Sequence, residues 1–378
     1  MAALLAAVAP HPPAGLKITG SNGKGSTAAM CEAILRSHGL RSGLYTSPHL
    51  FSVHERIRLD GEPIAEAELC RWLDRVLPAA EAIAPGAFAS FEVLTAVAAG
   101  WYSEQGADVV VWEAGIGGRL DATRPLRAAV TVLVNVALEH TALLGATLEA
   151  IALEKADLAD PGSTLVVGPI GDLLVRRVAA HVAPTRVMVA EGDVPPLALA
   201  GAHQIENARC ALTACRELLG GRFDPERARR AVASAAWPGR LQKMRETGPE
   251  VWVDAAHNED GLLRVAEALP ALFGGRPFVL VLGVSADRPV ERMAPLLAPL
   301  AAEVVCTAAR HKGAPAERVA AACGRPAAAV PRLREALDWA EERARQLGAV
   351  VLVTGGLFVA AEAMAILGGH DEERLKFL

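Results

Sequence analysis

The sequence predicts an α/β protein with a P-loop-type, mainly parallel sheet domain followed by a smaller Rossmann-like α/β domain. Apolar β-branched runs alternate with helical patterns along the chain, which is the βαβ rhythm of a parallel sheet. The first run leads into a glycine-rich turn and then a helical pattern, as phosphate-binding loops do. A Pro-Gly break in AWPGRLQ, residues 236–242, divides two such series, so we expect domains at 1–237 and 238–378.

The first series opens with MAALLAAVAP, which we expect to form a short helix rather than a signal peptide because it lacks a basic n-region. Near-continuous apolar runs then predict strands that are covered on both faces. These strands are expected at 16–19, 42–47, 108–115, 128–137 and 163–168. A helix is expected at 202–220, where two glycines end it.

The second series predicts another open α/β sheet. Its strands are expected within EVWVDAAHN (250–258), PFVLVLGV (277–284), AEVVCTA (302–308) and AVVLVTGG (349–356). Its helices are expected at 261–273, 332–348 and 357–367.

Composition excludes several classes of function. The formal net charge is -5 and lysines and arginines form no block interleaved with aromatics, so we expect no nucleic-acid partner. Apolar runs stay below the roughly 18 to 20 residues of a membrane span, so we expect a cytoplasmic protein without a membrane partner. We also expect a monomer. The six cysteines form no C-x-x-C pair and are expected to be reduced packing residues.

The stretch LKITGSNGKGSTAAM, residues 16–30, contains the glycine-rich turn. The usual phosphate-binding loop reads G-x-x-x-x-G-K-[ST]. Here only two residues separate the first two glycines, the lysine is followed by glycine, and the hydroxyls come one position late. The residues concerned are Gly20, Ser21, Asn22, Gly23, Lys24, Gly25, Ser26 and Thr27. Taken alone, they leave open an altered nucleotide site and a simple glycine turn.

Polar residues follow several expected strands, at the edge where open α/β sheets bind ligands. They are Ser47, Glu113, Asp121, Glu139, His140, Asp254 and His257, with Lys155 and Arg240 as further candidates. Each could alternatively be a helix cap or a solvated turn residue. Because a phosphate loop implies Mg²⁺, which prefers oxygen ligands, Ser47, Glu113 and His140 form a plausible incomplete shell. Water and phosphate oxygens would complete it.

The chain contains, in this order, TGSNGKGST, YTSPHL with ERI, FEVLTAVA, WEAGIGGRLDAT, NVALEHTALLG with EKA, HQIENARCAL, WPGRLQ, VDAAHN and VLVTGGLF. This set resembles the folylpolyglutamate synthetase and dihydrofolate synthetase family of the Mur ligase superfamily. The resemblance implies that the glycine-rich turn is that family's own phosphate loop. It also implies an ATP-dependent amide ligase that adds L-glutamate to a pterin or folate carboxylate through an acyl phosphate.

The resemblance implies nucleotide-binding roles by position. Lys24 and the amides of residues 21–27 would hold the phosphates of ATP, and Asn207 would contact the adenine region. Arg240 would also reach the phosphates. The further residues implied at the nucleotide and the catalytic centre are Asp254 and His257.

Metal and substrate roles follow in the same way from the resemblance. Ser47, Glu113 and His140 would bind magnesium, and a carbamate on Lys155 would supply oxygens to a second magnesium ion. The residues implied to hold the pterin are Phe91 and Asp121.

Three positions depart from the family's pattern, which commonly has aspartate at Glu139, proline at Glu259 and serine at Gly356. These changes leave the ATP-binding residues intact but bear on the choice of acyl acceptor. A Mur-like ligase acting on a different carboxylate or amino acid is therefore one alternative. A P-loop ATPase or kinase without ligation is another, and a nucleotide-binding module without turnover is a third.

Overall fold

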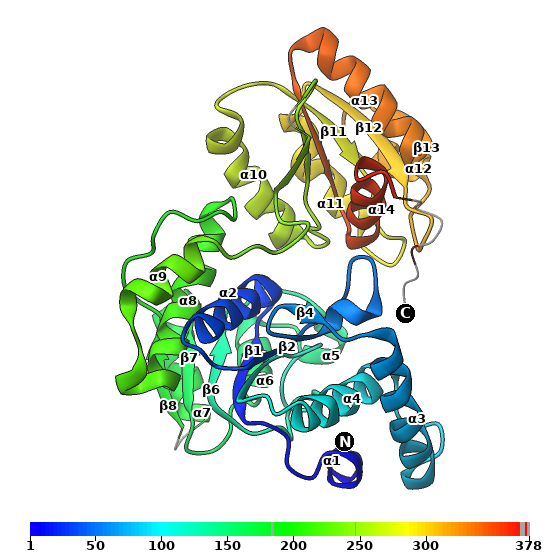
Figure 1. The fold of residues 1–378 in the computed structure, drawn as a ribbon. Helices are drawn as coiled ribbons and strands as arrows, with labels where there is room; N and C mark the ends of the chain where they lie inside the picture. The colour runs from blue at the N-terminus through cyan, green and yellow to red at the C-terminus, as the bar shows by residue number, and fades with distance from the viewer. Residues whose placement is uncertain (183–184, 246, 371–374, 376–378) are drawn as a thin grey trace. The chain divides into compact units, whose positions relative to one another are not determined.

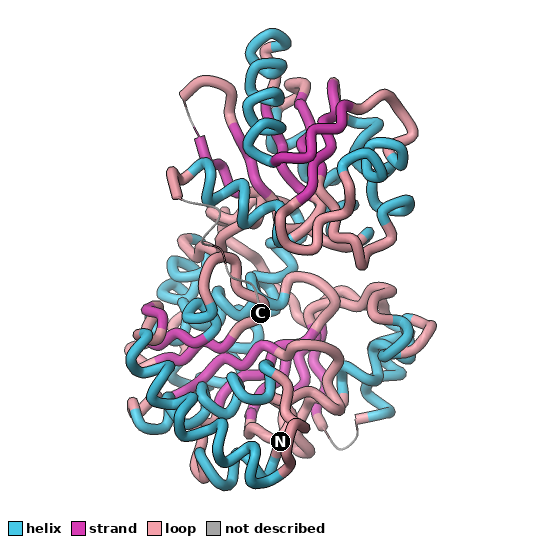
Figure 2. The backbone as a smooth tube through the Cα atoms, turned by 90° about the vertical axis from the view of Figure 1, so that its right-hand side faces the viewer, coloured by secondary structure: helices cyan, strands magenta, loops and turns pink. Residues whose placement is uncertain are grey.

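The computed structural model describes residues 1–182, 185–245, 247–370 and 375. The chain divides into two compact units (Figure 1). Unit 1 comprises Met1–Ala198 and Gln204–Ala236, and unit 2 comprises Leu199–His203 and the described residues from Trp237 onward. Each unit has one sheet flanked by helices, so the predicted α/β class is confirmed (Figure 2). Independent domains at 1–237 and 238–378 stay a prediction.

Unit 1 is built on an eight-stranded sheet of order β4-β3-β2-β5-β1-β6-β7-β8 within the described residues. Its strands are β1 Gly15–Thr19, β2 Ser42–Tyr45, β3 Ile57–Leu59, β4 Glu62–Pro63, β5 Val109–Glu113, β6 Ala128–Leu133, β7 Thr164–Val167 and β8 Arg186–Val189. The strands from β2 across to β8 run parallel, and β3 and β4 add an antiparallel edge. All residues of β1 and β5 are buried, as strands covered on both faces require.

The strand predicted at 128–137 is too long, because β6 ends at Leu133. Beyond it, Val134 still donates its amide to Thr19 O at 2.9 Å, but Asn135 and Ala137 bond to Ser21 instead of a strand. The backbone of residues 135–137 therefore bonds to the glycine-rich loop instead of extending the strand.

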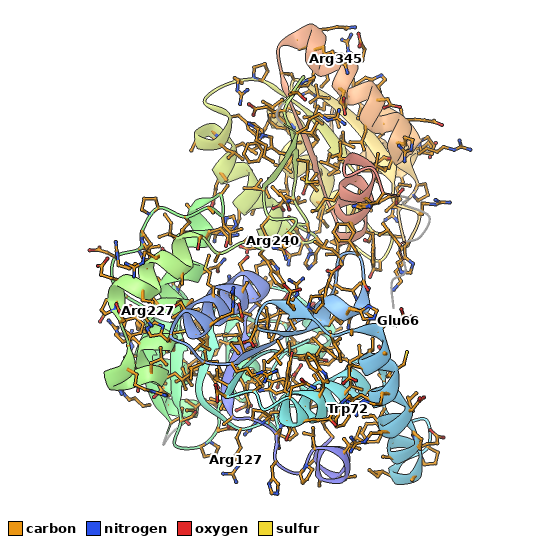
Figure 3. The ribbon with its side chains drawn as sticks, viewed as in Figure 1. Glu66, Trp72, Arg127, Arg227, Arg240 and Arg345 are labelled. Carbon is orange, nitrogen blue, oxygen red and sulfur yellow. The ribbon has the colours of Figure 1, made fainter. Side chains whose placement is uncertain are left out.

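The helices of unit 1 cover this sheet. They are α1 Ala2–Val8, α2 Lys24–Ser37, α3 Glu66–Ile83, α4 Ser90–Glu104, α5 Thr141–Leu144, α6 Leu148–Ala156, α7 Asp172–His181, α8 Ala202–Leu219 and α9 Pro225–Ala233, with short 3₁₀ turns at Val53–Arg56 and Gly220–Arg222. The short helix predicted at the start of the chain is confirmed as α1. It buries Leu4 and Leu5 in an apolar cluster with Trp72 of α3, which Figure 3 labels, and Trp101 of α4.

Unit 2 has a six-stranded sheet of order β13-β12-β11-β14-β10-β9 within the described residues. Its elements are β9 Gln242–Arg245, β10 Val251–Val253, α10 Glu259–Phe273, β11 Phe278–Leu282, α11 Val290–Leu297, a 3₁₀ turn Ala298–Leu300, β12 Glu303–Ala308, α12 Ala316–Ala322, β13 Ala328–Arg332, α13 Leu333–Leu347, β14 Val350–Thr354 and α14 Leu357–Leu367. Only β9 runs antiparallel to its neighbour. No helix in the described part of the chain is long and apolar enough to cross a membrane.

Candidate active site

The loop between β1 and α2 has a glycine where its backbone demands one. Gly23 has φ +78°, which side chains rarely adopt, and a Cβ there would lie 2.3 Å from Asn207 Oδ1. Asn207, on α8, is 2% exposed and its Nδ2 donates to Gln204 Oε1 at 2.9 Å. The structure therefore places Asn207 against the loop backbone as a support. Its contact with adenine stays a prediction.

Asn135 fixes the first half of the loop. Its backbone carbonyl accepts from Ser21 N at 3.2 Å, and its side-chain Oδ1 accepts from Asn22 N at 2.8 Å. Ser21 Oγ also donates to Ala137 O at 3.2 Å and accepts from Ala137 N at 2.9 Å. This corrects one expectation, since the amides of Ser21 and Asn22 are used within the protein. The amides that open α2 lie at a helix N-terminus, the kind of position where helices bind anions, and a phosphate contact there stays a prediction.

The first turn of α2 carries three polar side chains, those of Lys24, Ser26 and Thr27. Lys24 Nζ donates to Gly20 O at 2.9 Å, which folds the ammonium back over the loop. Ser26 Oγ and Thr27 Oγ1 are buried and have no hydrogen-bond partner among the described residues. Buried hydroxyls are normally paired, so these two fit a ligand that brings its own oxygens or a cation. The role of this loop in binding phosphate stays a prediction.

Glu113 ends β5, the strand beside β1, so its side chain lies at the same sheet edge as the glycine-rich loop. It is 3% exposed, and its Oε2 accepts from Ser47 N at 3.1 Å. The structure therefore brings Ser47 and Glu113 together. His140 follows β6, on the other side of β1, with a left-handed backbone at φ +44°. Among the described residues no group of three or more His, Cys, Asp or Glu side chains is arranged to hold a metal ion.

Glu139 and Lys155 form a buried ion pair that sequence reasoning missed. Lys155 Nζ lies 2.8 Å from Glu139 Oε1, and the side chains are 2% and 10% exposed. Burial lowers the pKa of Lys155, and the nearby Lys24 ammonium lowers it further against the attraction of Glu139. Burial alone would raise the pKa of Glu139, but Lys24 and Lys155 bring it below its usual value. Glu139 lies in the loop after β6 and Lys155 lies on α6, 16 positions later. The sequence therefore gave no signal that the two side chains would pair.

Asp121 organises the loop that follows β5. Its Oδ2 accepts from the amides of Gly115 at 2.8 Å and Ile116 at 3.2 Å, and its Oδ1 accepts from the Thr123 amide at 2.9 Å and hydroxyl at 2.6 Å. These four donors fill the acceptor positions of a carboxylate. The turn-capping alternative therefore describes this structure, and a direct pterin contact would require Asp121 to release a donor. Phe91 lies against the same loop, since a Cβ on Gly115 would be 2.9 Å from its ring.

Arg56 and His49 are further residues that the sequence indicated only as parts of motifs. Arg56 Nε donates to His49 Nδ1 at 2.9 Å, and the two residues are 8% and 3% exposed. Burial lowers the pKa of Arg56, while Tyr45 and Glu113 raise it. A buried cation thus lies close enough to the Glu113 carboxylate for the two charges to interact.

In unit 2, Asp254 joins the end of β10 to the loop before β9. Its Oδ2 accepts from Leu241 N at 2.9 Å and its Oδ1 from Ala256 N at 2.7 Å. Arg240, labelled in Figure 3, lies in that loop and donates to Gly239 O at 3.2 Å. The structure therefore brings Arg240 and Asp254 into one corner of unit 2.

Two histidines lie in the same part of unit 2. His257 Nδ1 faces Ala255 O at 3.1 Å, so Nδ1 carries the hydrogen because a carbonyl can only accept. Burial lowers the pKa of His203, with Asp254 opposing and Arg240 adding to the effect. His203 was quoted within a motif but given no role, because its proximity to Asp254 spans 51 positions of sequence.

Two of the three departures are accommodated locally. Glu259 Oε2 accepts from Arg292 Nη2 at 2.8 Å at the first turn of α10. Gly356 is extended, and a Cβ there would lie 3.4 Å from Gly283 O and 3.5 Å from Ser285 Oγ. The backbone would therefore accept a serine with a small adjustment.

Comparisons with known proteins extend over most of the chain. Residues 239–357 match the family described as Mur ligase, glutamate ligase domain. The folylpolyglutamate synthase of Lacticaseibacillus casei is 31% identical over 94% of this chain and 90% of its own length. A protein of Haloferax volcanii, named a probable bifunctional folylpolyglutamate synthase/dihydropteroate synthase, is 35% identical over 92% of this chain. The match spans only 45% of that protein's length.

A solved structure is also similar. Escherichia coli FolC in complex with DHPP and ADP has a TM-score of 0.86 and 28% sequence identity, over 97% of this chain and 91% of that one. The similarity therefore includes the fold of both units and not only their sequence motifs.

Proposed function

This chain belongs to the folylpolyglutamate synthase/dihydrofolate synthase family of the Mur ligase superfamily, and we propose that it joins L-glutamate to a folate-type carboxylate with hydrolysis of ATP to ADP and phosphate. The observation that carries the proposal is the arrangement at one edge of the unit 1 sheet. There the glycine-rich loop after β1 lies between Glu113 at the end of β5 and the Glu139–Lys155 pair after β6. The FolC structure that resembles this chain contains DHPP and ADP, which supports a pterin and a nucleotide as ligands.

The first chemical step is attack of the substrate carboxylate on the γ-phosphate of ATP, which gives an acyl phosphate and ADP. Catalysis of phosphoryl transfer consists mainly of positioning and charge stabilisation. Lys24 and the amides of the first turn of α2 supply positive charge to the phosphates. The amine of L-glutamate then attacks the acyl carbon, phosphate leaves, and an amide remains.

Magnesium fits the donor set of unit 1. The buried, unpaired hydroxyls of Ser26 and Thr27 and the Glu113 carboxylate offer the oxygen ligands that this cation prefers. We propose that Ser47, Glu113 and His140 hold one ion, and that a carbamate on Lys155, replacing its bond to Glu139, holds a second. Magnesium, when bound, neutralises charge on the phosphate oxygens. The lowered pKa of Lys155, caused by burial and then by Lys24, favours the neutral amine that takes up carbon dioxide.

The loop of residues 114–126 and Phe91 form the proposed place for the pterin. Phe91 is half-buried and can stack on a flat heterocycle. Asp121 acts on this site by fixing the loop through its four hydrogen bonds. In unit 2, Arg240, Asp254 and His257 are proposed to act on the nucleotide and the transferring group. We further propose that the protein is a cytoplasmic monomer. Size-exclusion chromatography with light scattering would measure its molar mass and so test the monomeric state.

The experiment is an ADP-release assay with ATP, Mg²⁺ and L-glutamate, in which dihydropteroate, reduced folates and unrelated carboxylic acids are offered in turn. Release that requires both dihydropteroate or a reduced folate and L-glutamate, with the amide identified by mass, supports the proposal. Release stimulated only by another carboxylic acid would keep the ligase and discard the folate substrate. Release that needs no amino acid would favour an ATPase or kinase.

A further inference from the structure

Lys17 is a fully buried lysine in the middle of β1, three residues before the glycine-rich loop. Its ammonium makes three contacts: Arg124 O at 3.0 Å, Leu158 O at 3.3 Å and Asp160 Oδ1 at 2.9 Å. An ammonium has three hydrogens, so its donors are fully used. Since an isolated buried charge is costly, a lysine kept here must be compensated by what it joins.

The three partners belong to two segments that carry site residues. Arg124 follows Asp121 by three positions and donates its own amide to Asp121 O at 3.0 Å. Leu158 follows Lys155 by three positions and donates its amide to Lys155 O at 3.1 Å. Lys17 therefore ties the strand of the phosphate loop both to the Asp121 loop and to the end of α6.

Asp160 closes this arrangement. Its Oδ1 accepts from Arg124 Nη1 at 3.0 Å as well as from Lys17, and its Oδ2 accepts from the amide of Ala128 at 2.7 Å, where β6 begins. The carboxylate thus fixes the two ends of the segment from Arg124 to Ala128. The fully buried Lys17 and the partly exposed Asp160 therefore hold the chain where it passes from the Asp121 loop into β6.

Thr19 holds the same loop nearer to the phosphate site. It lies two residues after Lys17, on the same face of β1, and its Oγ1 donates to Gly117 O at 2.8 Å. The next residue, Gly118, lies so close to α6 that a Cβ would be 2.5 Å from Lys155 O. The loop from 114 to 126 is therefore clamped between β1 and the last turn of α6.

We propose that Lys17 is a positioning residue, which sets the Asp121 loop and Lys155 relative to the phosphate loop without touching a substrate. The alternative is that Lys17 only neutralises Asp160. The inference rests on the proposed function for one point, that the loop of residues 114–126 binds the acyl substrate. The phosphate loop itself is held by Asn135 and Ser21, which Lys17 does not contact.

The test uses the full chain with Lys17→Met, Asp160→Asn and the double variant. The double variant removes both charges of the Lys17–Asp160 pair and leaves Arg124, whose side chain is 33% exposed, without its ion pair to position 160. Lys243→Met is a control in unit 2, where the Lys243 ammonium, on a side chain that is 31% exposed, pairs with the Glu250 carboxylate at 3.3 Å. Amide hydrogen exchange is measured without substrates, and KM is measured separately for dihydropteroate and for ATP.

In the double variant we expect amide exchange to rise in residues 114–126 and 154–160 and to stay unchanged in unit 2 and in residues 20–30. The KM for dihydropteroate should rise about 10-fold or more, since displacements near 1 Å have large kinetic effects, with a change below about twofold for ATP. Unchanged exchange in the loop of the double variant would overturn the proposal, as would an equal rise of both KM values. If dihydropteroate is not a substrate, the proposed function fails, but the exchange data still show whether Lys17 positions the loop. Failure of the proposed function and failure of the Lys17 proposal can therefore be distinguished.

Discussion

Replacing Glu139 by glutamine should destabilise unit 1 through the ammonium that it leaves behind. Lys155 is 2% exposed and pairs with Glu139 at 2.8 Å. Removing one partner of a buried ion pair costs about 3–5 kcal/mol. The upper limit is set by deprotonation, because neutralising a lysine of ordinary pKa 10.5 at pH 7 costs about 5 kcal/mol.

The expected loss lies near the lower end of that range. The Glu139 side chain is 10% exposed, so water reaches the pair, and the pKa of Lys155 is already lowered by burial and by Lys24. We therefore expect a decrease of about 3 kcal/mol in the free energy of unfolding of unit 1. For a domain of this size, about 1 kcal/mol shifts Tm by about 2–4 °C, so Tm should fall by about 6–12 °C.

Differential scanning calorimetry at pH 7, in carbonate-free buffer and without nucleotide, measures this shift. The double variant Glu139→Gln/Lys155→Met removes both charges and should regain most of the lost stability. A Tm of Glu139→Gln within about 2 °C of the parent, or a double variant no more stable than the single one, would refute the reasoning.

The same variant has a defined pH dependence. The pKa of Lys155 is lowered in the folded protein by burial and then by Lys24, so between that pKa and 10.5 the unfolded chain binds more protons. The free energy of unfolding should therefore rise with pH through that window, and more steeply in Glu139→Gln. The pKa of Glu139 is depressed by Lys24 and Lys155 against the effect of burial, so its contribution is complete above pH 4.5 and is lost as pH falls through its folded pKa. Glu139→Gln should not show this loss of unfolding free energy at acidic pH, because it has no carboxylate at position 139.

Three further changes test the candidate site. Lys24→Ala should lower kcat for ADP release about 10²-fold or more, since a fixed charge at the phosphates is removed while circular dichroism stays unchanged. Gly23→Ala should weaken ATP binding, because the left-handed backbone costs about 1–2 kcal/mol and the new Cβ meets Asn207 Oδ1 at 2.3 Å; titration calorimetry should show partial recovery in Gly23→Ala/Asn207→Ala. Asp121→Ala should raise the KM for dihydropteroate much more than that for ATP, and equal effects on both substrates would contradict a role confined to the loop.

The sequence was most informative where one short segment contains its own partners. The strand, glycine turn and helix from 15 to 37 are consecutive, so their order alone predicts a strand–turn–helix unit, and the resemblance to the family identifies its turn as a phosphate loop. Asp121 also bonds within its own loop, and its spacing of two from Thr123 is a local capping signal, although the resemblance implied a pterin contact for Asp121. Local patterns of this kind need no knowledge of the sheet order.

Contacts between distant segments could not be predicted from the residues alone. Glu113 contacts Ser47 because β5 pairs with β2. Apolar runs predict where strands lie in the sequence but not which strands are neighbours in the sheet. In the same way LKIT predicts a strand, but only the fold shows that Lys17 is buried against Asp160. The missed residues share this property, since each acts through a partner on another element.

Glu139 links one departure from the family's pattern to the chemistry of Lys155. An aspartate at this position would be shorter by one C–C bond, about 1.5 Å, which would move its carboxylate beyond hydrogen-bond distance of an ammonium now at 2.8 Å. The longer side chain therefore gives Lys155 a protein carboxylate as partner. A carbamate on Lys155 must replace that ion pair, and it returns a negative charge to the same place. If Lys155 is carbamylated as proposed, the departure would make carbamate uptake an exchange of one carboxylate for another. Its extent would then depend on what draws Glu139 away, and the Lys24 ammonium is one group that attracts Glu139.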